Sequence, residues 1–206
     1  MKISSYPEPQ SEGFSFTAEN EARAKTICAR YPEDRRASAT IALLDLAQRQ
    51  NDGWLSREAI EFVAQYLEVA PIRVYEVASF YTMFNLKPVG KHFIQVCRTT
   101  PCWLRGSDGI TNACKKKLGV GIGEVTEDGM FSIIEVECLG ACANAPMVQI
   151  NDHYYEDLTP QRMEEIIDEL RAGEAVKVGS QTGRLASAPE GGPQTLLEVV
   201  KSGEGD

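Results

Sequence analysis

Residues 130–150, MFSIIEVECLGACANAPMVQI, place a β-prone run, a cysteine pair and a second apolar run close together in the chain. The first run, Met130 to Glu137, is rich in β-branched and aromatic residues and predicts a strand that leads directly into Cys138. Cys142 follows after the small stretch Leu-Gly-Ala, and Met147–Ile150 begins a hairpin. A cysteine pair at the end of a strand is well placed for a metal site.

A second cysteine pair lies upstream in the same setting. Residues 92–96, HFIQV, predict a short strand that ends at Cys97, and Cys102 follows after four further residues. Soft thiolate donors hold iron and sulfide together, and a [2Fe-2S] rhomb takes two ligands per iron. We therefore predict one [2Fe-2S] cluster with one cysteine pair on each iron, on Cys97, Cys102, Cys138 and Cys142.

The loops around these cysteines have the composition that such a site requires. Four thiolates leave negative charge that must be offset by hydrogen-bond donors and cations, and small residues let backbone N–H groups approach the sulfur atoms. We expect these roles for Gly140, Ala141, Ala143, Thr99, Thr100, Arg98 and Arg105.

Other uses of the four thiols remain open. Zinc also accepts four thiolates, although its paired knuckles usually show C-x2-C spacing at one or both ends. Thiol redox chemistry favours a Cys-x-x-Cys pair, which this chain lacks. Disulfides do not fit the reducing compartment that we expect for a chain without an apolar signal region.

The remaining candidate residues have simpler interpretations. Cys28 and Cys114 fall within predicted helices outside both loops, so we expect buried or inert thiols there. His92 and His153 lie on predicted strands and are interpreted as ordinary sheet residues. The run 119–123, GVGIG, follows a helix, whereas a dinucleotide fingerprint must lie between a strand and a helix. We therefore expect no catalytic residue and no nucleotide site on this chain.

The periodicity along the chain predicts an α+β protein with two folded parts. Apolar residues at helical spacing precede the Lys-Pro-Val-Gly linker at 87–90, and the order β-α-β-β-β-α follows it. That order is typical of a thioredoxin-like α/β layer. We predict a flexible arm over 1–16, a helical bundle over 17–86, a thioredoxin-like [2Fe-2S] domain over 87–173 and a flexible tail over 174–206.

The composition narrows the possible partners. A net charge of −9 argues against nucleic acid as the main partner, because phosphate binding requires a surplus of Lys and Arg. No stretch approaches the roughly 20 apolar residues that span a bilayer, so we expect no direct membrane insertion. The early acidic residues do not fit a transit peptide. A cytoplasmic bacterial protein fits best, with a processed mitochondrial matrix chain as the alternative.

Two stretches carry a resemblance to a known family. Residues 75–84, YEVASFYTMF, together with 97–102, CRTTPC, resemble the 24 kDa subunit family of respiratory complex I, NADH:quinone oxidoreductase. Residues 134–151, IEVECLGACANAPMVQIN, are similar to the second cluster loop of that family almost residue for residue. The resemblance covers roughly residues 14–175 and includes all four cysteines.

The resemblance implies a function for the chain. It implies a helical domain joined to a thioredoxin-like ferredoxin domain with one [2Fe-2S] cluster, which exchanges single electrons with FMN on an NADH-oxidising flavoprotein subunit. Other peripheral-arm iron–sulfur subunits would be further partners, and the complex would lie on the inner face of the bacterial plasma membrane. The small diaphorase subunit of an NAD-linked hydrogenase or formate dehydrogenase keeps the same pattern and is one alternative. A zinc-stapled docking module is another.

Overall fold

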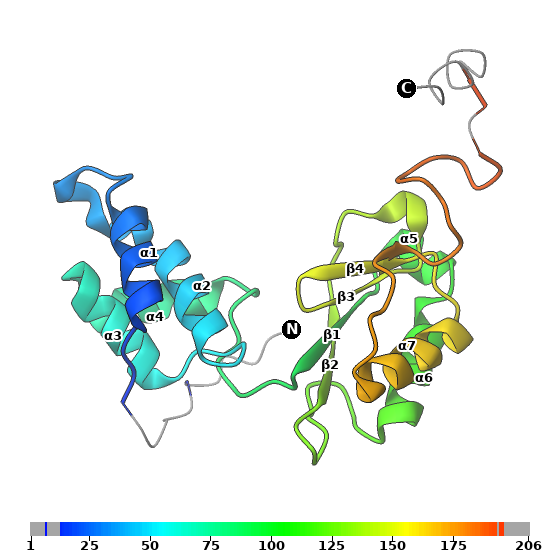
Figure 1. The fold of residues 1–206 in the computed structure, drawn as a ribbon, viewed down its shortest axis with the longest axis horizontal. Helices are drawn as coiled ribbons and strands as arrows, with labels where there is room; N and C mark the ends of the chain where they lie inside the picture. Colours follow the sequence, from blue (N-terminus) through cyan, green and yellow to red (C-terminus); the bar gives the residue numbers. More distant parts are fainter. Residues whose placement is uncertain (1–6, 8–12, 193, 196–206) are drawn as a thin grey trace. The chain divides into compact units, whose positions relative to one another are not determined.

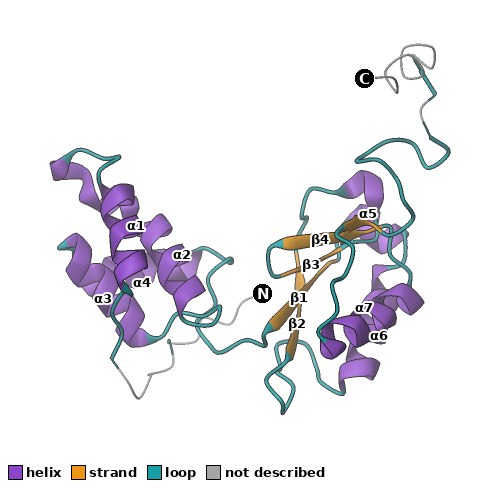
Figure 2. Ribbon diagram, viewed as in Figure 1, coloured by secondary structure: helices purple, strands orange, loops and turns teal. Residues whose placement is uncertain are grey.

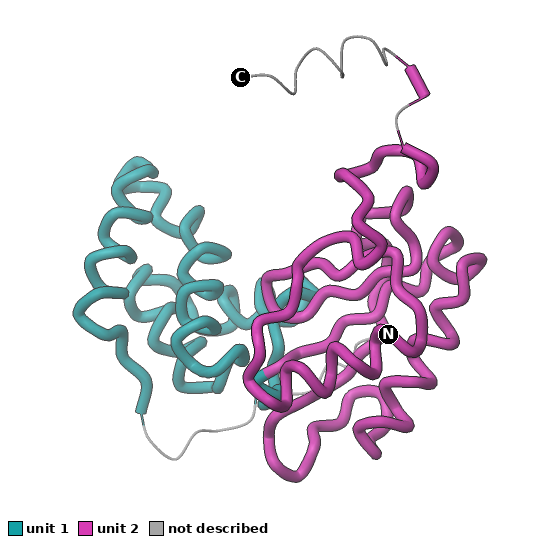
Figure 3. Tube along the Cα trace, turned by 45° about the vertical axis from the view of Figure 1, so that its right-hand side comes forward, with its two compact units in different colours: residues 1–91 teal, residues 92–206 magenta. Residues whose placement is uncertain are grey.

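The computed structural model describes residues 7, 13–192 and 194–195 of the chain. Its contacts divide the chain into two compact units, Met1–Lys91 and His92–Asp206, which Figure 3 shows in teal and magenta. The division falls close to the predicted linker. That each unit folds on its own stays a prediction.

The first unit is built from helices (Figure 1). Its elements are α1 (Ala18–Cys28), the 3-10 helix η1 (Glu33–Ala39), α2 (Thr40–Gln50), α3 (Arg57–Leu67) and α4 (Pro71–Phe80). Two hydroxyl side chains define helix starts, because Thr17 Oγ1 and Ser56 Oγ accept from the N–H groups of Asn20 and Ala59. Pro71 occupies the first turn of α4, where its missing N–H is not needed.

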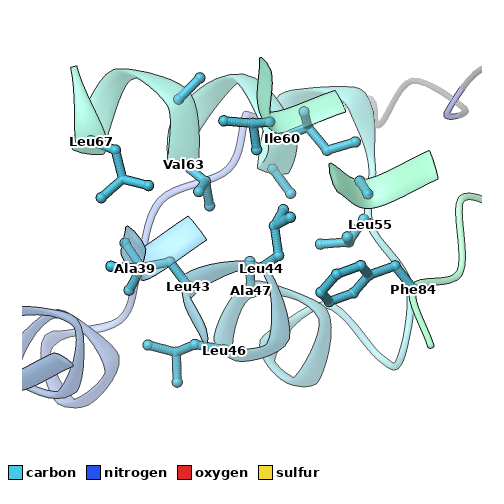
Figure 4. Packing of buried hydrophobic residues seen from close by; sticks show 14 of the residues in the cluster. Ala39, Leu43, Leu44, Leu46, Ala47, Leu55, Ile60, Val63, Leu67 and Phe84 are labelled. Carbon is cyan, nitrogen blue, oxygen red and sulfur yellow. The ribbon is translucent and has the colours of Figure 1, made fainter. Parts of the chain in front are cut away.

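The core of this unit is formed by the helices together with the segment that follows α4. Leu43, Leu44, Val63 and Phe84 are fully buried there, and Figure 4 shows how side chains from these elements interdigitate. The helical spacing of the apolar residues puts them on one face of each helix, so packing buries them together.

The second unit is a mixed sheet with helices against it (Figure 2). Its strands are β1 (His92–Cys97), β2 (Phe131–Val136), β3 (Val148–Ile150), β4 (His153–Glu156) and β5 (Gly179–Ser180), in the order β2-β1-β3-β4-β5. The β1–β2 and β4–β5 pairs are parallel, whereas the β1–β3 and β3–β4 pairs are antiparallel. Asn151, at φ 53°, lies in the turn between β3 and β4.

Helices α6 (Ser107–Leu118) and α7 (Pro160–Ala172) lie side by side against the sheet (Figure 1). Ile110 of α6 and Met163, Ile166 and Ile167 of α7 pack with strand residues in one buried cluster. Gly119 and Gly173 end these helices in the left-handed conformation that glycine adopts without strain. This α/β layer is the predicted fold class.

The structure adds elements that the periodicity does not predict. Within the predicted helical bundle, η1 is a 3-10 helix with a kink at Arg35, and a short helix α5 (Thr100–Leu104) lies in the first cysteine loop. Phe14 and Phe16, within the expected arm, pack against Phe62, while most of that arm lies outside the described residues.

The region predicted as a flexible tail also differs in part. Residues 179–180 form β5, because they pair with β4 at the edge of the sheet. The end of that region, from 196 onward, lies outside the described residues. Within the described part of the chain, no helix is long and apolar enough to cross a membrane.

Candidate metal centre

The topology brings the two cysteine loops to one edge of the sheet. Strands β1 and β2 are parallel, and Cys97 pairs with Val136. Two residues after Val136 the second loop begins at Cys138. The carboxyl ends of two neighbouring parallel strands lie at the same end of the sheet, so both loops begin side by side.

The four thiols differ in their access to solvent. Cys97, at the end of β1, and Cys102, within α5, are buried against Ala145 and Met147. Cys138 and Cys142 are exposed. Leu139 and Ala141, from the loop between the exposed cysteines, pack on the same buried cluster. The site therefore has a buried pair toward the protein and an exposed pair toward solvent.

The thiols are arranged as two pairs. The sulfur atoms of Cys138 and Cys142 lie 3.5 Å apart. The Cys97 and Cys102 thiols each shift the pKa of the other, so they also form a pair. The Thr99 hydroxyl oxygen lies 3.6 Å from the Cys97 sulfur, and the same hydroxyl lowers the pKa of Cys138. Among the described residues, no three His, Cys, Asp or Glu side chains are gathered to hold a single metal ion.

The buried pair has opposite shifts in pKa. Burial raises the pKa of the Cys97 thiol, but hydrogen bonds from the Leu139 N–H and the Thr99 hydroxyl outweigh burial, so the net pKa is lowered. Burial and the neighbouring Cys97 raise the pKa of Cys102 to about 12. Cys97 therefore loses its proton more readily than Cys102.

The exposed pair behaves in the same way. The Gly140 N–H and the Cys142 side chain lower the pKa of Cys138, while the hydrogen bond with Cys138 raises the pKa of Cys142. In both pairs, a second thiolate would be repelled by the first. Ionisation of all four thiols thus needs positive charge at the centre, which the two ferric ions of a [2Fe-2S] cluster carry. The donor set and its division into pairs fit such a cluster.

Backbone donors point at the sulfur atoms. The Gly140 N–H donates to the Cys138 sulfur at 3.4 Å, with Gly140 at a φ of 86° that L side chains rarely adopt. The backbone N–H of Leu139 lowers the pKa of the Cys97 thiol, and that of Met147 acts in the same direction on Cys102. The expected role of small residues is therefore seen at Gly140, where the chain turns its N–H inward.

The two arginines expected to offset the negative charge of the site, Arg98 and Arg105, both contact other groups of the protein. Arg98 forms an ion pair with Glu135, which offsets its charge. The Arg105 Nε donates to the Ala145 carbonyl at 3.4 Å. Arg105 therefore holds the chain beside the buried pair, a role that its charge alone does not indicate.

Sequence reasoning missed Tyr154, whose hydroxyl donates to the Leu139 carbonyl at 2.8 Å. The alternation of β4 carries a signal, because Tyr155 is buried in the core and its neighbour Tyr154 must point to the other face. Leu139 and Met147 act on the thiols through their backbone N–H groups, so their residue types do not predict this role.

The other candidate residues belong to other parts of the fold. Cys114 is buried on α6 in the core between helices and sheet, and Cys28 belongs to the helical unit. The His92 ring packs on Phe131, with ring centroids 5.1 Å apart, and His153 is exposed at the start of β4.

A mixed sheet with two helices against it and two cysteine loops at one edge is the architecture of a ferredoxin built on a thioredoxin-like layer. A family model described as "Thioredoxin-like [2Fe-2S] ferredoxin" matches residues 24–171. The chain belongs to this family.

Two relatives are similar over most of the chain. A subunit of the NADH-quinone oxidoreductase of Rickettsia bellii is 65% identical over 158 residues, which are 77% of this chain and 95% of that protein. The mitochondrial NADH dehydrogenase [ubiquinone] flavoprotein 2 of Dictyostelium discoideum is 52% identical over 185 residues, 90% of this chain and 75% of that protein.

The fold also matches a solved structure. An NAD+-reducing [NiFe]-hydrogenase in the air-oxidized state superposes with a TM-score of 0.58 at 21% identity, over 66% of this chain and 23% of that chain. At this identity the likeness shows the fold alone.

Proposed function

We propose that this chain is the electron-transferring small subunit of an NADH:quinone oxidoreductase and holds one [2Fe-2S] cluster on Cys97, Cys102, Cys138 and Cys142. The observation that carries the proposal is the convergence of two thiol pairs at one sheet edge, in a member of the thioredoxin-like [2Fe-2S] ferredoxin family. The names of the relatives at 65% and 52% identity support the assignment to this enzyme.

The residues of the chain would bind the group and adjust its charge. When bound, a [2Fe-2S] cluster supplies one-electron redox chemistry. The Gly140 N–H donates to the Cys138 sulfur, and the Leu139 N–H lowers the pKa of Cys97. Such donors stabilise negative charge on sulfur and so favour the reduced state.

The exposure of the second pair indicates where a partner would approach. Cys138 and Cys142 are exposed, whereas Cys97 and Cys102 are buried. A flavoprotein subunit with FMN and the NADH site would therefore face the loop that carries the exposed pair. In this proposal the chain acts as part of an oxidoreductase and binds no substrate itself. Other peripheral-arm iron–sulfur subunits would complete the assembly on the inner face of the bacterial plasma membrane.

The alternatives have less support. The likeness to the NAD+-reducing hydrogenase is at 21% identity, whereas the relatives named for NADH-quinone oxidoreductase reach 65%. A zinc-stapled docking module would use the same thiols but would have no redox function. The family to which the chain belongs is a [2Fe-2S] ferredoxin family.

Metal analysis tests the cluster. Anaerobic purification should give about two irons and two sulfides per chain, as one rhomb requires, with a visible spectrum that dithionite bleaches. Cys138→Ser or Cys142→Ser should abolish that spectrum, whereas Cys28→Ser and Cys114→Ser, outside the site, should leave it intact. A colourless protein with zinc would refute the cluster.

Copurification tests the assembly. A tagged chain should bring down a flavoprotein and membrane-embedded quinone-reducing subunits from its native membranes. Recovery with a hydrogenase or molybdenum subunit instead would replace the respiratory function with the diaphorase function.

A further inference from the structure

The segment 179–188 follows α7 and returns to the edge of the sheet beside β4, as the orange part of the ribbon in Figure 1 shows. Gly179 pairs with Tyr155 and Ser180 with Glu156, and the Gln181 N–H donates to the Glu156 carbonyl at 3.0 Å. This segment is therefore attached to the strand that leads toward Asp157.

A largely buried ion pair anchors the segment. Arg184 Nη2 lies 2.9 Å from Asp157 Oδ1, and the side chains of the two residues are 10% and 4% exposed. The contact is ionic, because Oδ1 has no aligned hydrogen bond. Asp157 Oδ2 accepts from the Ser180 hydroxyl at 2.7 Å, and Ser180 Oγ accepts from the Arg184 N–H at 3.1 Å. Ser180, Asp157 and Arg184 thus form one connected network.

The other end of the same guanidinium reaches the second cysteine loop. Arg184 Nη1 donates to the Ala143 carbonyl at 2.8 Å, and Ala143 directly follows Cys142. The next residue, Asn144, is buried and donates through Nδ2 to the Ala186 carbonyl at 2.8 Å. The Asn144 carbonyl in turn accepts from the Asp157 N–H at 2.7 Å. Both residues after Cys142 are therefore attached to the segment.

We propose that Arg184 is a positioning residue for the second cysteine loop, and that residues 179–188 act as a strap that fixes Cys142 in place for the cluster. The proposal rests on the proposed function, because it assumes that Cys142 is a ligand. The charge of Arg184 is offset by Asp157, so its main effect is on the position of the loop rather than on the field at the site. A planar guanidinium makes both contacts at once, which a lysine cannot do.

The test uses the full-length chain and a double variant. Arg184→Met alone leaves the Asp157 carboxylate buried without its cation, so Asp157→Asn is combined with it to keep the network neutral. Lys117→Met is the matched control, because Lys117 forms an ion pair with Asp168 between α6 and α7 in the same unit. Arg184→Lys is the conservative variant.

Three readouts follow the cluster and the loop. We expect the double variant to lose iron to a chelator about tenfold faster than the unmodified chain, the effect of losing one charge-assisted hydrogen bond. The electron paramagnetic resonance spectrum of the reduced double variant should broaden or shift relative to that of the unmodified chain. Arg184→Lys should show a smaller change of the same kind. In the metal-free chain, hydrogen exchange of residues 138–147 should be faster in the double variant.

The outcomes separate the strap from the cluster. Equal iron loss in the double variant and the unmodified chain would overturn the strap, and so would equal acceleration by Lys117→Met. If the unmodified chain held no iron and sulfide, the proposed function would fail. Faster exchange in the metal-free double variant would then still support a strap on the loop, whereas unchanged exchange would overturn it.

Discussion

The Tyr154 hydroxyl and the Leu139 carbonyl are joined by a 2.8 Å hydrogen bond that ties β4 to the second cysteine loop. The N–H of the same Leu139 lowers the pKa of the Cys97 thiol in the first loop. One residue of the second loop therefore connects the central hairpin with the buried thiol pair. Since Leu139 lies in the second loop and acts on Cys97 in the first, a substitution of Tyr154 should affect the environment of both cysteine pairs.

Tyr154→Phe removes this hydrogen bond while it keeps the ring. We expect the free energy of unfolding to fall by about 1 kcal/mol, the net value of one such bond. The spectrum of the bound cluster should also change, because the loop that carries the Leu139 N–H is less restrained. Chemical denaturation and visible circular dichroism measure the two effects. Tyr31→Phe, at an exposed position of the helical unit, is the control and should change neither.

Gly140→Ala tests the left-handed turn that aims an N–H at Cys138. An added Cβ would meet no heavy atom within 4 Å, so the cost is backbone strain of about 1–2 kcal/mol. Gly119 at the end of α6 also has a positive φ, and a Cβ added there would likewise meet no heavy atom within 4 Å, so Gly119→Ala is the control. Both variants should lose similar stability, but only Gly140→Ala should lower the reduction potential. A potential that shifts equally in both variants would contradict the role of this N–H.

The cysteines of the metal-free chain should differ in reactivity. Cys138 is exposed and the Gly140 N–H lowers its pKa, so iodoacetamide at about pH 8 should modify it first. Burial raises the pKa of Cys114 to about 12, so this thiol should remain unmodified while the chain is folded. Peptide mass spectrometry measures the order. Rapid modification of Cys114 would mean that α6 detaches from the sheet under these conditions.

Leu44→Ala tests whether the helical unit is a separate domain. Leu44 is fully buried, so its truncation should lower the free energy of unfolding of that unit by about 2–5 kcal/mol. If the predicted domains are independent, the cluster spectrum should stay unchanged, and thermal unfolding should show the helical unit melting first. Loss of the cluster together with the helical unit would argue for one cooperative domain.

Much of the fold can be predicted from the sequence, because the signals for its elements are local. Apolar residues at helical spacing predict α3 and α7, and the β-prone runs before Cys97 and Cys138 predict β1 and β2. The predictions fail where a signal is not local. A two-residue strand such as β5 has no periodicity of its own and exists only because β4 offers it an edge. Helix α5 is similarly too short to show a helical pattern.

The sequence by itself determined which donors are available, since four thiols in two spaced pairs after predicted strands are a chemical property of the chain. Only the tertiary structure decided how those thiols are held. Every residue other than proline has a backbone N–H, so nothing in the sequence shows that the N–H groups of Leu139 and Met147 act on the thiols. Arg184 meets Ala143 across 41 positions of sequence, and a contact of that separation forms only when the folded sheet edge brings both segments together.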